Sequence, residues 1–212
     1  MTRTEIVVLG GGGHAKVLIS ILKKSHTYAV LGYTDPTPRG DILGVPYLGA
    51  DDALSMLRRQ RSSCAAAIGI GTVRLSLLRT ERRQFLEALG FTLPPIVAPA
   101  ATVNEDVEVG FASVVFDGAV VNSGSRIGQG VILNTHCTVE HDCTIEDDVH
   151  VAPGVTLSGG VQVGARSIVG AGATVIQAVA ICADCFIGAG ATVVAPISQP
   201  GVYVGTPARR LR

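Results

Sequence analysis

The dominant pattern in the chain is an aliphatic residue at every sixth position from Val97 to Val193. Every position in this series is Val, Ile or Leu: Val97, Val103, Val109, Val115, Val121, Ile127, Leu133, Val139, Ile145, Val151, Leu157, Val163, Val169, Val175, Ile181, Ile187 and Val193. Four residues after each of them, up to Ala191, lies a small residue such as Ala, Ser, Cys or Val. The slot three residues after each is mostly Gly, Ala or Asp, which are types that suit tight turns. A period of six fits neither a helix nor an ordinary two-faced strand, and it predicts a parallel β-helix built from hexapeptides.

Each hexapeptide is expected to form one short strand and one turn, and three of them should close one triangular coil. The aliphatic and small slots then point inward and stack on the same slots eighteen residues later. One coil cannot bury its own apolar face, so stability must come from stacking on neighbouring coils. The repeats predict about five coils, or roughly 25 Å of stack at ~4.8 Å per strand spacing.

The first part of the chain has a different pattern, with buried-strand and helical segments in alternation. Residues 4–9 predict a strand, followed by four glycines and a helix with apolar residues at helical spacing. Further elements are expected as strands at 29–33 and 65–70 and helices at 51–59 and 73–89. Strands alternating with helices predict a parallel sheet of Rossmann-like βαβ type. We therefore expect a Rossmann-like nucleotide-binding domain over 1–95, a β-helix over 96–195 and a C-terminal loop over 196–212.

The glycine turn between the first strand and helix is a candidate phosphate site. The string Gly10-x-Gly12-x-x-Ala15 fits the dinucleotide fingerprint, and Asp35 follows at a distance that suits a ribose hydroxyl. A helix N-terminus offers free N–H groups and the positive end of the helix dipole. The domain is only about half of a full dinucleotide fold, so the pattern favours some nucleotide more than NAD. A purely structural glycine turn is the alternative.

Composition excludes several classes of function. Formal net charge is zero and no basic stripe is present, which argues against nucleic acid or an anionic membrane as partner. No apolar run approaches the ~18 residues of a membrane span, and no signal-peptide pattern is seen, so a cytoplasmic protein is expected.

The five cysteines predict neither a disulfide framework nor a metal site. Cys137, Cys143 and Cys185 fall in the small inward slot, where they suit the core. Cys182-x-x-Cys185 has the spacing of a metal or redox pair, but its two residues occupy different slots and no second pair exists.

Polar residues interrupt the bland repeat in one segment, residues 134–143, with His150 shortly after. His141 and Asp142 fall on outward turn slots. An imidazole titrates near neutrality and can take a proton from an attacking amine or hydroxyl, and a neighbouring carboxylate can fix its tautomer. An inert surface histidine is the alternative, but three histidines within fifteen residues of a His-poor repeat favour a site.

Three motifs together give the chain a specific resemblance. They are Gly-Gly-Gly-Gly-His-Ala-Lys-Val at 10–17, Asn-Thr-x-x-x-Val-Glu-His-Asp-Cys at 134–143 and Val-Gly-x-Pro-Ala-Arg at 204–209. The chain resembles the NeuD/PglD family of sugar O- and N-acyltransferases of bacterial surface-glycan biosynthesis. The resemblance implies a left-handed β-helix, a homotrimer with active sites at grooves between neighbouring β-helices, and acetyl-CoA lying along each groove. The implied acceptor is an amino sugar carried on a nucleoside diphosphate held by the N-terminal domain, with no metal.

The same resemblance assigns roles to individual residues. It implies that His141 is the general base, that Asp142 supports it and that Asn134 orients the imidazole. His150 would lie near the acyl thioester, where it or a backbone N–H would stabilise the oxyanion. The residues implied to line the arm of acetyl-CoA are Gly159, Ala171 and Ala189. Those implied to hold the nucleotide sugar are Gly12, Gly13, His14, Lys16, Asp35, Gly69 and Thr72.

Three other functions remain open at this stage. An O-acetyltransferase acting on sialic acid or another sugar would use the same machinery. A γ-type carbonic anhydrase is suggested by the five-residue spacing of His136 and His141, but its third zinc ligand would fall at Ala100. A trimeric binder of nucleotide sugars without turnover would not need a base at this turn. The nucleotide base, the length of the acyl donor and the role of His136 stay undetermined.

Overall fold

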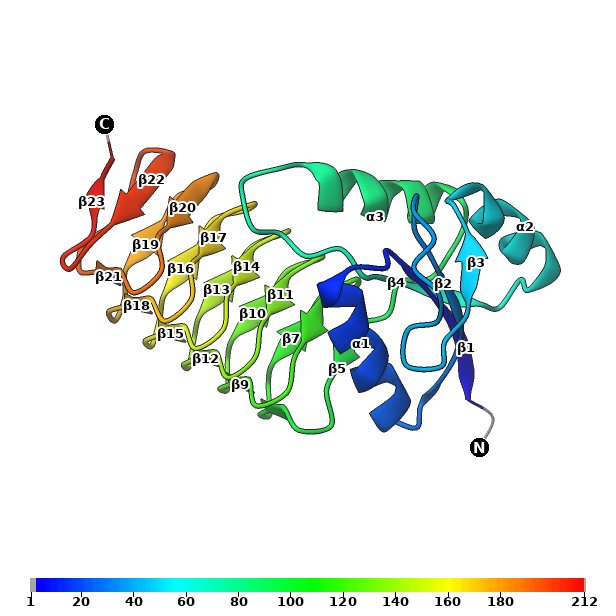
Figure 1. Ribbon diagram of the computed structural model, residues 1–212. Coiled ribbons are helices and arrows are strands. Elements are labelled where there is room, and N and C mark those ends of the chain that lie inside the picture. The colour runs from blue at the N-terminus through cyan, green and yellow to red at the C-terminus, as the bar shows by residue number, and fades with distance from the viewer. Residues whose placement is uncertain (1–2, 212) are drawn as a thin grey trace. The chain divides into compact units, whose positions relative to one another are not determined.

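The computed structural model describes residues 3–211, which form two compact units. The first unit extends to Gly71 and includes Leu78–Pro99. The second contains Thr72–Leu77 and the chain from Ala100 onward. The first unit is thus a helix-and-sheet unit and the second a long repeat of short strands (Figure 1).

The first unit is built on a four-stranded sheet in the order β3-β2-β1-β4, in which all neighbouring strands are parallel. Its strands are β1 (Thr4–Leu9), β2 (Tyr28–Thr34), β3 (Tyr47–Gly49) and β4 (Ala65–Ile68). Its helices are α1 (Gly13–Lys24), α2 (Asp52–Gln60) and α3 (Leu78–Ala88). All four residues of β4 are buried, as are the last four of β1, in agreement with their unbroken apolar sequence. The unit also contains the two-residue strand β5 (Ile96–Val97), which is not part of this four-stranded sheet.

Helix α1 forms where the glycine turn and the apolar spacing predict it. Its buried face consists of Ala15, Leu18, Ile19, Ile21 and Leu22. Lys23 and Lys24 occupy its last turn, where positive charge is favourable to the helix dipole. No acidic residue lies in its first turn, so the N–H groups at Gly13 keep their positive potential.

Two expectations for the first unit were wrong in detail. The helix predicted over 73–89 begins only at Leu78, and the six residues before it belong to the second unit. Strand β3 was not predicted, because three residues are too few to establish an alternating pattern.

The second unit is a parallel β-helix with a strict eighteen-residue register. Ile132, for example, pairs with Val114 on one side and with His150 on the other. Two of its three sheets run in the orders β19-β16-β13-β10-β7 and β21-β18-β15-β12-β9-β6, and the third runs from β23 and β22 through β20, β17, β14 and β11 to β8 (Figure 1). The strands are β6 (Thr102–Val103), β7 (Glu108–Val109), β8 (Val114–Val115), β9 (Val120–Val121), β10 (Arg126–Ile127), β11 (Ile132–Leu133), β12 (Thr138–Val139), β13 (Thr144–Ile145), β14 (His150–Val151), β15 (Thr156–Leu157), β16 (Gln162–Val163), β17 (Ile168–Val169), β18 (Thr174–Val175), β19 (Ala180–Ile181), β20 (Cys185–Ile187) and β21 (Thr192–Val193).

The core of the β-helix is filled by the two inward slots read from the sequence. Leu133, Val139, Val151 and Leu157 are completely buried, and so is Cys137 in the small slot. The predicted β-helix and its register are therefore confirmed.

Three serines in the small slot make a recurring contact that the sequence pattern did not indicate. Ser113 donates its hydroxyl to the carbonyl of Gly128 (2.7 Å) and accepts from the amide of Val131 (2.9 Å). Ser125 and Ser167 bridge the corresponding corners of their next coils in the same way. We call this two-sided contact a serine clamp. Each clamp satisfies two backbone groups that the corner would otherwise bury unpaired.

The end of the β-helix is closed by strands where a loop was expected. Strand β22 (Gly201–Val204) pairs in parallel with β20, and β23 (Arg209–Arg210) pairs antiparallel with β22. Here Ile187 pairs with Tyr203, an offset of sixteen residues and not eighteen, since the repeat has ended.

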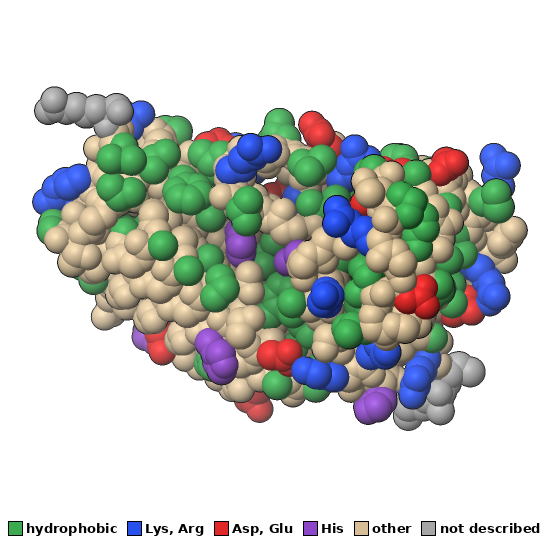
Figure 2. Space-filling model, in the orientation of Figure 1, with side chains coloured by type: hydrophobic (Ala, Val, Ile, Leu, Met, Phe, Trp, Pro, Cys, Tyr) green, Lys and Arg blue, Asp and Glu red, His purple; other side chains and the backbone are tan. Residues whose placement is uncertain are grey.

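No helix within residues 3–211 combines the length and apolar character needed to cross a membrane. On the face shown in Figure 2, basic and acidic side chains are interspersed and form no continuous stripe of one charge.

Candidate active site

The outward turn after β12 holds a histidine and a carboxylate in direct contact. His141 Nδ1 lies 2.7 Å from Asp142 Oδ2. Because a carboxylate only accepts, the Nδ1–H of His141 donates to it, and Nε2 keeps its lone pair. The two side chains are 58% and 72% exposed, so Nε2 is accessible to a ligand. This arrangement is that of a general base held in one tautomer by an acidic neighbour.

Glycines in the adjacent coils make room for this dyad. A Cβ added at Gly159 would lie 2.5 Å from His141 Nε2, and one added at Gly124 would lie 2.6 Å from Asp142 Oδ1. Both distances are shorter than real Cβ contacts, so a side chain at either position would displace part of the dyad. Gly159 was expected at this site from the resemblance, and Gly124 was not. Gly124 could have been found from the sequence, because it lies eighteen residues, or one coil, before Asp142.

The backbone of the turn is held by the serine clamp of Ser125. Its hydroxyl donates to the carbonyl of Glu140 (2.8 Å) and accepts from the amide of Cys143 (3.1 Å), which are the residues on either side of the dyad. Glu140 also accepts a hydrogen bond from Asn122 Nδ2 (2.8 Å). Asp142 itself adopts the left-handed backbone conformation, with φ of 58°, which Asp tolerates better than most residues. The turn is thus fixed by contacts from the preceding coil.

Asn134 and His150 form a second polar pair, separate from the dyad. Asn134 Nδ2 lies 3.1 Å from His150 Nε2, and His150 Nδ1 lies 2.6 Å from the carbonyl oxygen of Thr72. A carbonyl only accepts, so Nδ1 carries the proton and Nε2 of the neutral ring accepts from the amide of Asn134. In this tautomer Nε2 offers no donor to an oxyanion.

Within the chain, two residues contact other groups than those expected from the sequence. Asn134 was expected to orient His141, but within the chain its amide contacts His150. The reason is that β11, which ends just before Asn134, is paired with β14, which begins at His150, whereas His141 lies at the next corner. Thr72 was expected beside the nucleotide, but its carbonyl binds His150 in the β-helix unit.

The first unit contains a cavity of about 380 Å³ at the N-terminus of α1. Its lining combines the glycine turn, two basic residues and one acid: Gly11, Gly12, Gly13, Lys16, Arg39, Asp41, Ile42 and Leu43. An added Cβ at Gly12 or Gly13 would meet nothing within 4 Å, so a ligand can approach this backbone closely. Gly11 differs, because an added Cβ there would lie 2.5 Å from the ring of Tyr33. The geometry suits a phosphate or diphosphate group.

Asp35 fastens the glycine turn to the end of β2. Its Oδ2 accepts from the amide of Gly11 (2.8 Å) and its Oδ1 accepts from the amide of Thr37 (2.9 Å). Burial acts to raise the pKa of Asp35, but these two hydrogen bonds and nearby Arg39 outweigh it and hold the pKa below its ordinary value. Asp35 is therefore an ionised support of the glycine turn.

The other residues expected at the nucleotide site differ in where they lie. Gly12, Gly13 and Lys16 line the cavity. His14 lies with its ring beside Gly71. Gly69 is a packing residue, because an added Cβ would lie 2.7 Å from Val8 and 2.8 Å from Ala15. Sequence reasoning missed residues 39–43 of the lining. A signal was present in the charged, proline-containing loop that follows Asp35.

Ala171 and Ala189 occupy the same corner slot in two successive coils, and both are exposed. The glycines that follow them, Gly172 and Gly190, would also meet nothing if a Cβ were added. This corner is therefore open and free of large side chains over two coils.

His136 lies on the preceding corner of its coil and not near His141. An added Cβ at Gly118 would lie 2.4 Å from the ring of His136, which places this ring over the coil before it. His141 instead lies over Gly159, in the coil after it. Within residues 3–211, no three His, Cys, Asp or Glu side chains gather in a way that could hold a metal ion.

Comparisons with known proteins agree with this geometry. The model of the PglD N-terminal domain matches residues 5–80, and the model of bacterial transferase hexapeptides, six repeats long, matches residues 124–159 and 142–177. The comparison with curated proteins gave no match.

Among solved structures, PerB from Caulobacter crescentus in complex with CoA and GDP-perosamine is 36% identical, with a TM-score of 0.92 over 100% of this chain and 99% of that one. The acetyltransferase domain of PglB from Neisseria gonorrhoeae in complex with acetyl coenzyme A is 33% identical, with a TM-score of 0.88 over 99% of this chain and 100% of that one. WeeI from Acinetobacter baumannii, at 24% identity and a TM-score of 0.86 over 99% of this chain and 100% of that one, shares the fold. With relatives of this identity matching over essentially its whole length, the chain belongs to the NeuD/PglD-like family of left-handed β-helix sugar acetyltransferases.

Proposed function

We propose that this protein transfers the acetyl group of acetyl-CoA to the amine of a nucleotide-linked amino sugar, of the 4-amino-4,6-dideoxy type, in bacterial surface-glycan biosynthesis. The observation that carries the proposal is the dyad of His141 and Asp142, with Nε2 of the imidazole accessible above Gly159. A protein that only bound a nucleotide sugar would need no such base.

The reaction follows from the dyad. The neutral amine attacks the thioester carbonyl carbon, and His141 Nε2 takes the proton that the nitrogen loses. Asp142 stabilises the imidazolium that forms. The C–S bond then breaks, CoA leaves as a thiolate, and the imidazolium returns the proton to it or to water. No covalent enzyme intermediate is required, and a backbone N–H, not neutral His150, is the proposed donor to the oxyanion.

Acetyl-CoA supplies the acyl group, and the open corner at Ala171 and Ala189 fits its extended arm. Both residues are exposed and small, and the glycines after them leave the space above the backbone empty. The pantetheine arm is narrow and carries amide groups, so it suits a corner that presents backbone and little side chain. Gly159 lies on a different corner, that of His141, and would line the other side of the proposed groove beside the base.

The cavity at the start of α1 is proposed to hold the diphosphate of the acceptor. Lys16 and Arg39 provide positive charge, and the helix N-terminus adds N–H groups with no competing acid in the first turn. Asp41, also in the lining, provides acceptors for the sugar or the base.

We propose that the active form is a homotrimer in the cytoplasm, with the reaction at a groove between neighbouring β-helices. The exposure of the dyad supports this assembly, because water must be kept away from the reacting groups, and only a second protein surface over the dyad would do this. Light scattering of the purified protein would measure the mass directly, and a monomer at assay concentrations would contradict the trimer.

A thiol-release assay tests the proposed reaction. The protein is mixed with acetyl-CoA and, separately, with UDP- and GDP-linked 4-amino sugars and with free sialic acid. We expect release of CoA thiol with one nucleotide amino sugar, loss of that release in His141→Ala, and an intact fold and ligand binding in the variant. Asp142→Asn should retain some activity, because it keeps the ring in place but no longer stabilises the imidazolium.

Each other outcome has a definite meaning. Release with sialic acid alone would replace N-acetylation by O-acetylation of a sugar. Unchanged turnover in His141→Ala would remove this residue from the mechanism. Ligand binding without release across the whole panel would favour a binding protein.

A further inference from the structure

Cys182 occupies a slot of the repeat in which no other coil has a cysteine. In the four preceding coils its slot holds Gly110, Gly128, Glu146 and Gly164. Cys185 is different, since its slot holds small inward residues throughout the β-helix. Cys182 packs at the edge of the hydrophobic core, but none of these four coils has a cysteine in its slot.

The end of the repeat gives Cys182 the space for its side chain. At Gly164 an added Cβ would lie 2.4 Å from the amide nitrogen of Ala183 in the next coil, so a side chain is excluded there. Cys182 lies in the last such coil, since β20 next to it pairs with β22 at an altered offset. Cys182 is consequently half-buried and reachable from solvent.

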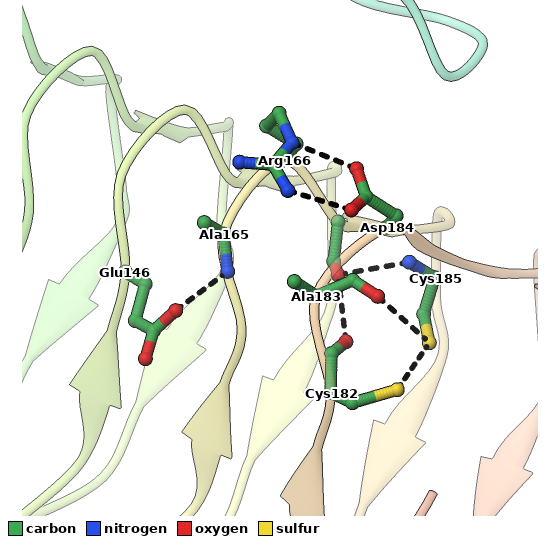
Figure 3. Close-up of polar contacts among 8 residues, drawn as sticks. Glu146, Ala165, Arg166, Cys182, Ala183, Asp184 and Cys185 are labelled. Carbon is green, nitrogen blue, oxygen red and sulfur yellow. Dashed lines mark hydrogen bonds and ion pairs between the residues drawn. The ribbon is translucent and has the colours of Figure 1, made fainter. Parts of the chain in front are cut away.

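The two sulfur atoms are brought together by the corner itself. Cys182 Sγ and Cys185 Sγ lie 3.5 Å apart (Figure 3). The serine clamp of Ser167 holds the turn between them, because its hydroxyl donates to the carbonyl of Cys182 (3.1 Å) and accepts from the amide of Cys185 (3.0 Å). Arg166 and Asp184 add a paired contact across the same corner, at 2.8 and 2.6 Å.

The other cysteines of the chain have neither feature. Cys64, Cys137 and Cys143 are all buried, and none has another sulfur among its hydrogen-bond partners. Cys182 thus combines access to solvent with a second thiol within reach.

We propose that Cys182 and Cys185 form a peroxide-sensitive oxidation site, in which a hydroperoxide converts the two thiols into one intrachain disulfide. The thiolate of Cys182 attacks the distal oxygen of the peroxide, whose O–O bond breaks, and a sulfenic acid forms while water or an alcohol leaves. The sulfur of Cys185 then attacks the sulfenic sulfur, its proton joins the departing hydroxyl, and a second water is released. Two thiols are oxidised by two electrons and one peroxide is reduced.

The order of these steps follows from the surroundings of the two sulfurs. Burial, and then the hydrogen bond to Cys182, raises the pKa of Cys185 to about 12, so Cys185 stays a thiol at neutral pH. Cys182, which is half-buried, meets the oxidant, and the buried Cys185 then reacts with the sulfenic acid of Cys182.

Peptide mass spectrometry on the full-length protein tests the site. The protein is treated with hydrogen peroxide, free thiols are alkylated in denaturant, and trypsin is added without reduction. Cleavage after Arg166 and Arg209 gives one peptide, 167–209, that contains only this pair, while peptide 127–166 contains Cys137 and Cys143. We expect peptide 167–209 to lose two hydrogens and to take up no alkyl group, while peptide 127–166 is alkylated twice.

Two variants separate a disulfide from other oxidation. Cys185→Ser is a mild change, because serine already occupies the same slot at Ser113 and Ser167. In this variant the oxidation of Cys182 should stop at sulfenic or sulfinic acid. Cys182→Ser should leave Cys185 alkylatable after peroxide. Oxidation of Cys182 to sulfinic acid with Cys185 still a thiol in the natural sequence would overturn the proposal. The proposal would also be overturned if both cysteines of peptide 167–209 were still alkylated at a peroxide dose that already oxidises the cysteines of peptide 127–166.

Discussion

Substitution of Ser125 tests whether its serine clamp positions the catalytic dyad as well as stabilising the fold. Ser125→Ala removes one donor and one acceptor from a completely buried site. The carbonyl of Glu140 and the amide of Cys143 then lose their partner, at 2.8 and 3.1 Å respectively. A buried backbone group left unpaired costs ~1–3 kcal/mol, and two groups are left unpaired here, so the variant should lose about 2 to 6 kcal/mol of unfolding free energy.

The same change should reduce catalysis. The dyad lies between the two backbone groups that Ser125 holds, so their release lets His141 and Asp142 shift relative to the bound acetyl-CoA. A displacement of ~1 Å at a reacting group costs up to about 100-fold in rate. We therefore expect kcat in the thiol-release assay to fall by about 10- to 100-fold at a temperature where the variant is fully folded.

Ser113→Ala is the matched control. Ser113 makes the same two contacts, to Gly128 and Val131, at a corner that carries no catalytic side chain. It should lose a similar unfolding free energy, measured by urea denaturation at equal protein concentration, and keep its kcat. If both variants lose activity equally, or if Ser125→Ala keeps full kcat while losing stability, the clamp does not position the dyad.

Three further predictions concern other parts of the molecule. Gly159→Ala should lower kcat about 10-fold or more with little loss of stability, because only the end of the His141 ring must move; an unchanged kcat would contradict this. Lys16→Met should raise the KM of the nucleotide sugar several-fold and leave that of acetyl-CoA unchanged, and a reversed pattern would remove the cavity as the acceptor site. Asp35 has a lowered pKa, so it stabilises the fold above the ordinary pKa of Asp (~3.9), and this stabilisation is lost as pH falls through the lower folded value. Acid titration of Asp35→Asn followed by circular dichroism should show a shallower loss of structure below pH ~4 than the natural sequence shows, and an identical curve would refute it.

The sequence predicted the β-helix well because a single rule repeats in it. From Ser113 to Val193 every aliphatic and small slot is buried in the core, and each residue's position follows from counting by six; only the first repeats, from Val97 to Val109, are more exposed. His141 and Asp142 were identified by the same rule, since they were polar residues on outward slots. The Gly159 contact also follows from counting, because it lies eighteen residues after His141.

The remaining features depend on contacts that no period encodes. Asn134 and His150 meet through strand pairing across a sheet, and Thr72 reaches His150 from a segment seventy-eight residues away. Arg39 lines the cavity at the N-terminus of α1 from an irregular loop, where no periodic pattern indicates the direction of a side chain. Strand β3 is too short to produce a pattern of its own.

The two closing strands have a consequence for solubility. A β-helix ends in exposed strand edges, and an unpaired edge is a template on which another copy of the chain can add. Strand β22 covers the edge of β20, and the antiparallel β23 then presents the exposed arginines Arg209 and Arg210 to solvent. Positive charge on a terminal strand disfavours end-to-end addition by repulsion. The short C-terminal hairpin thus covers the edge of one of the three sheets, the one that contains β20, and is expected to disfavour addition of another copy to that sheet.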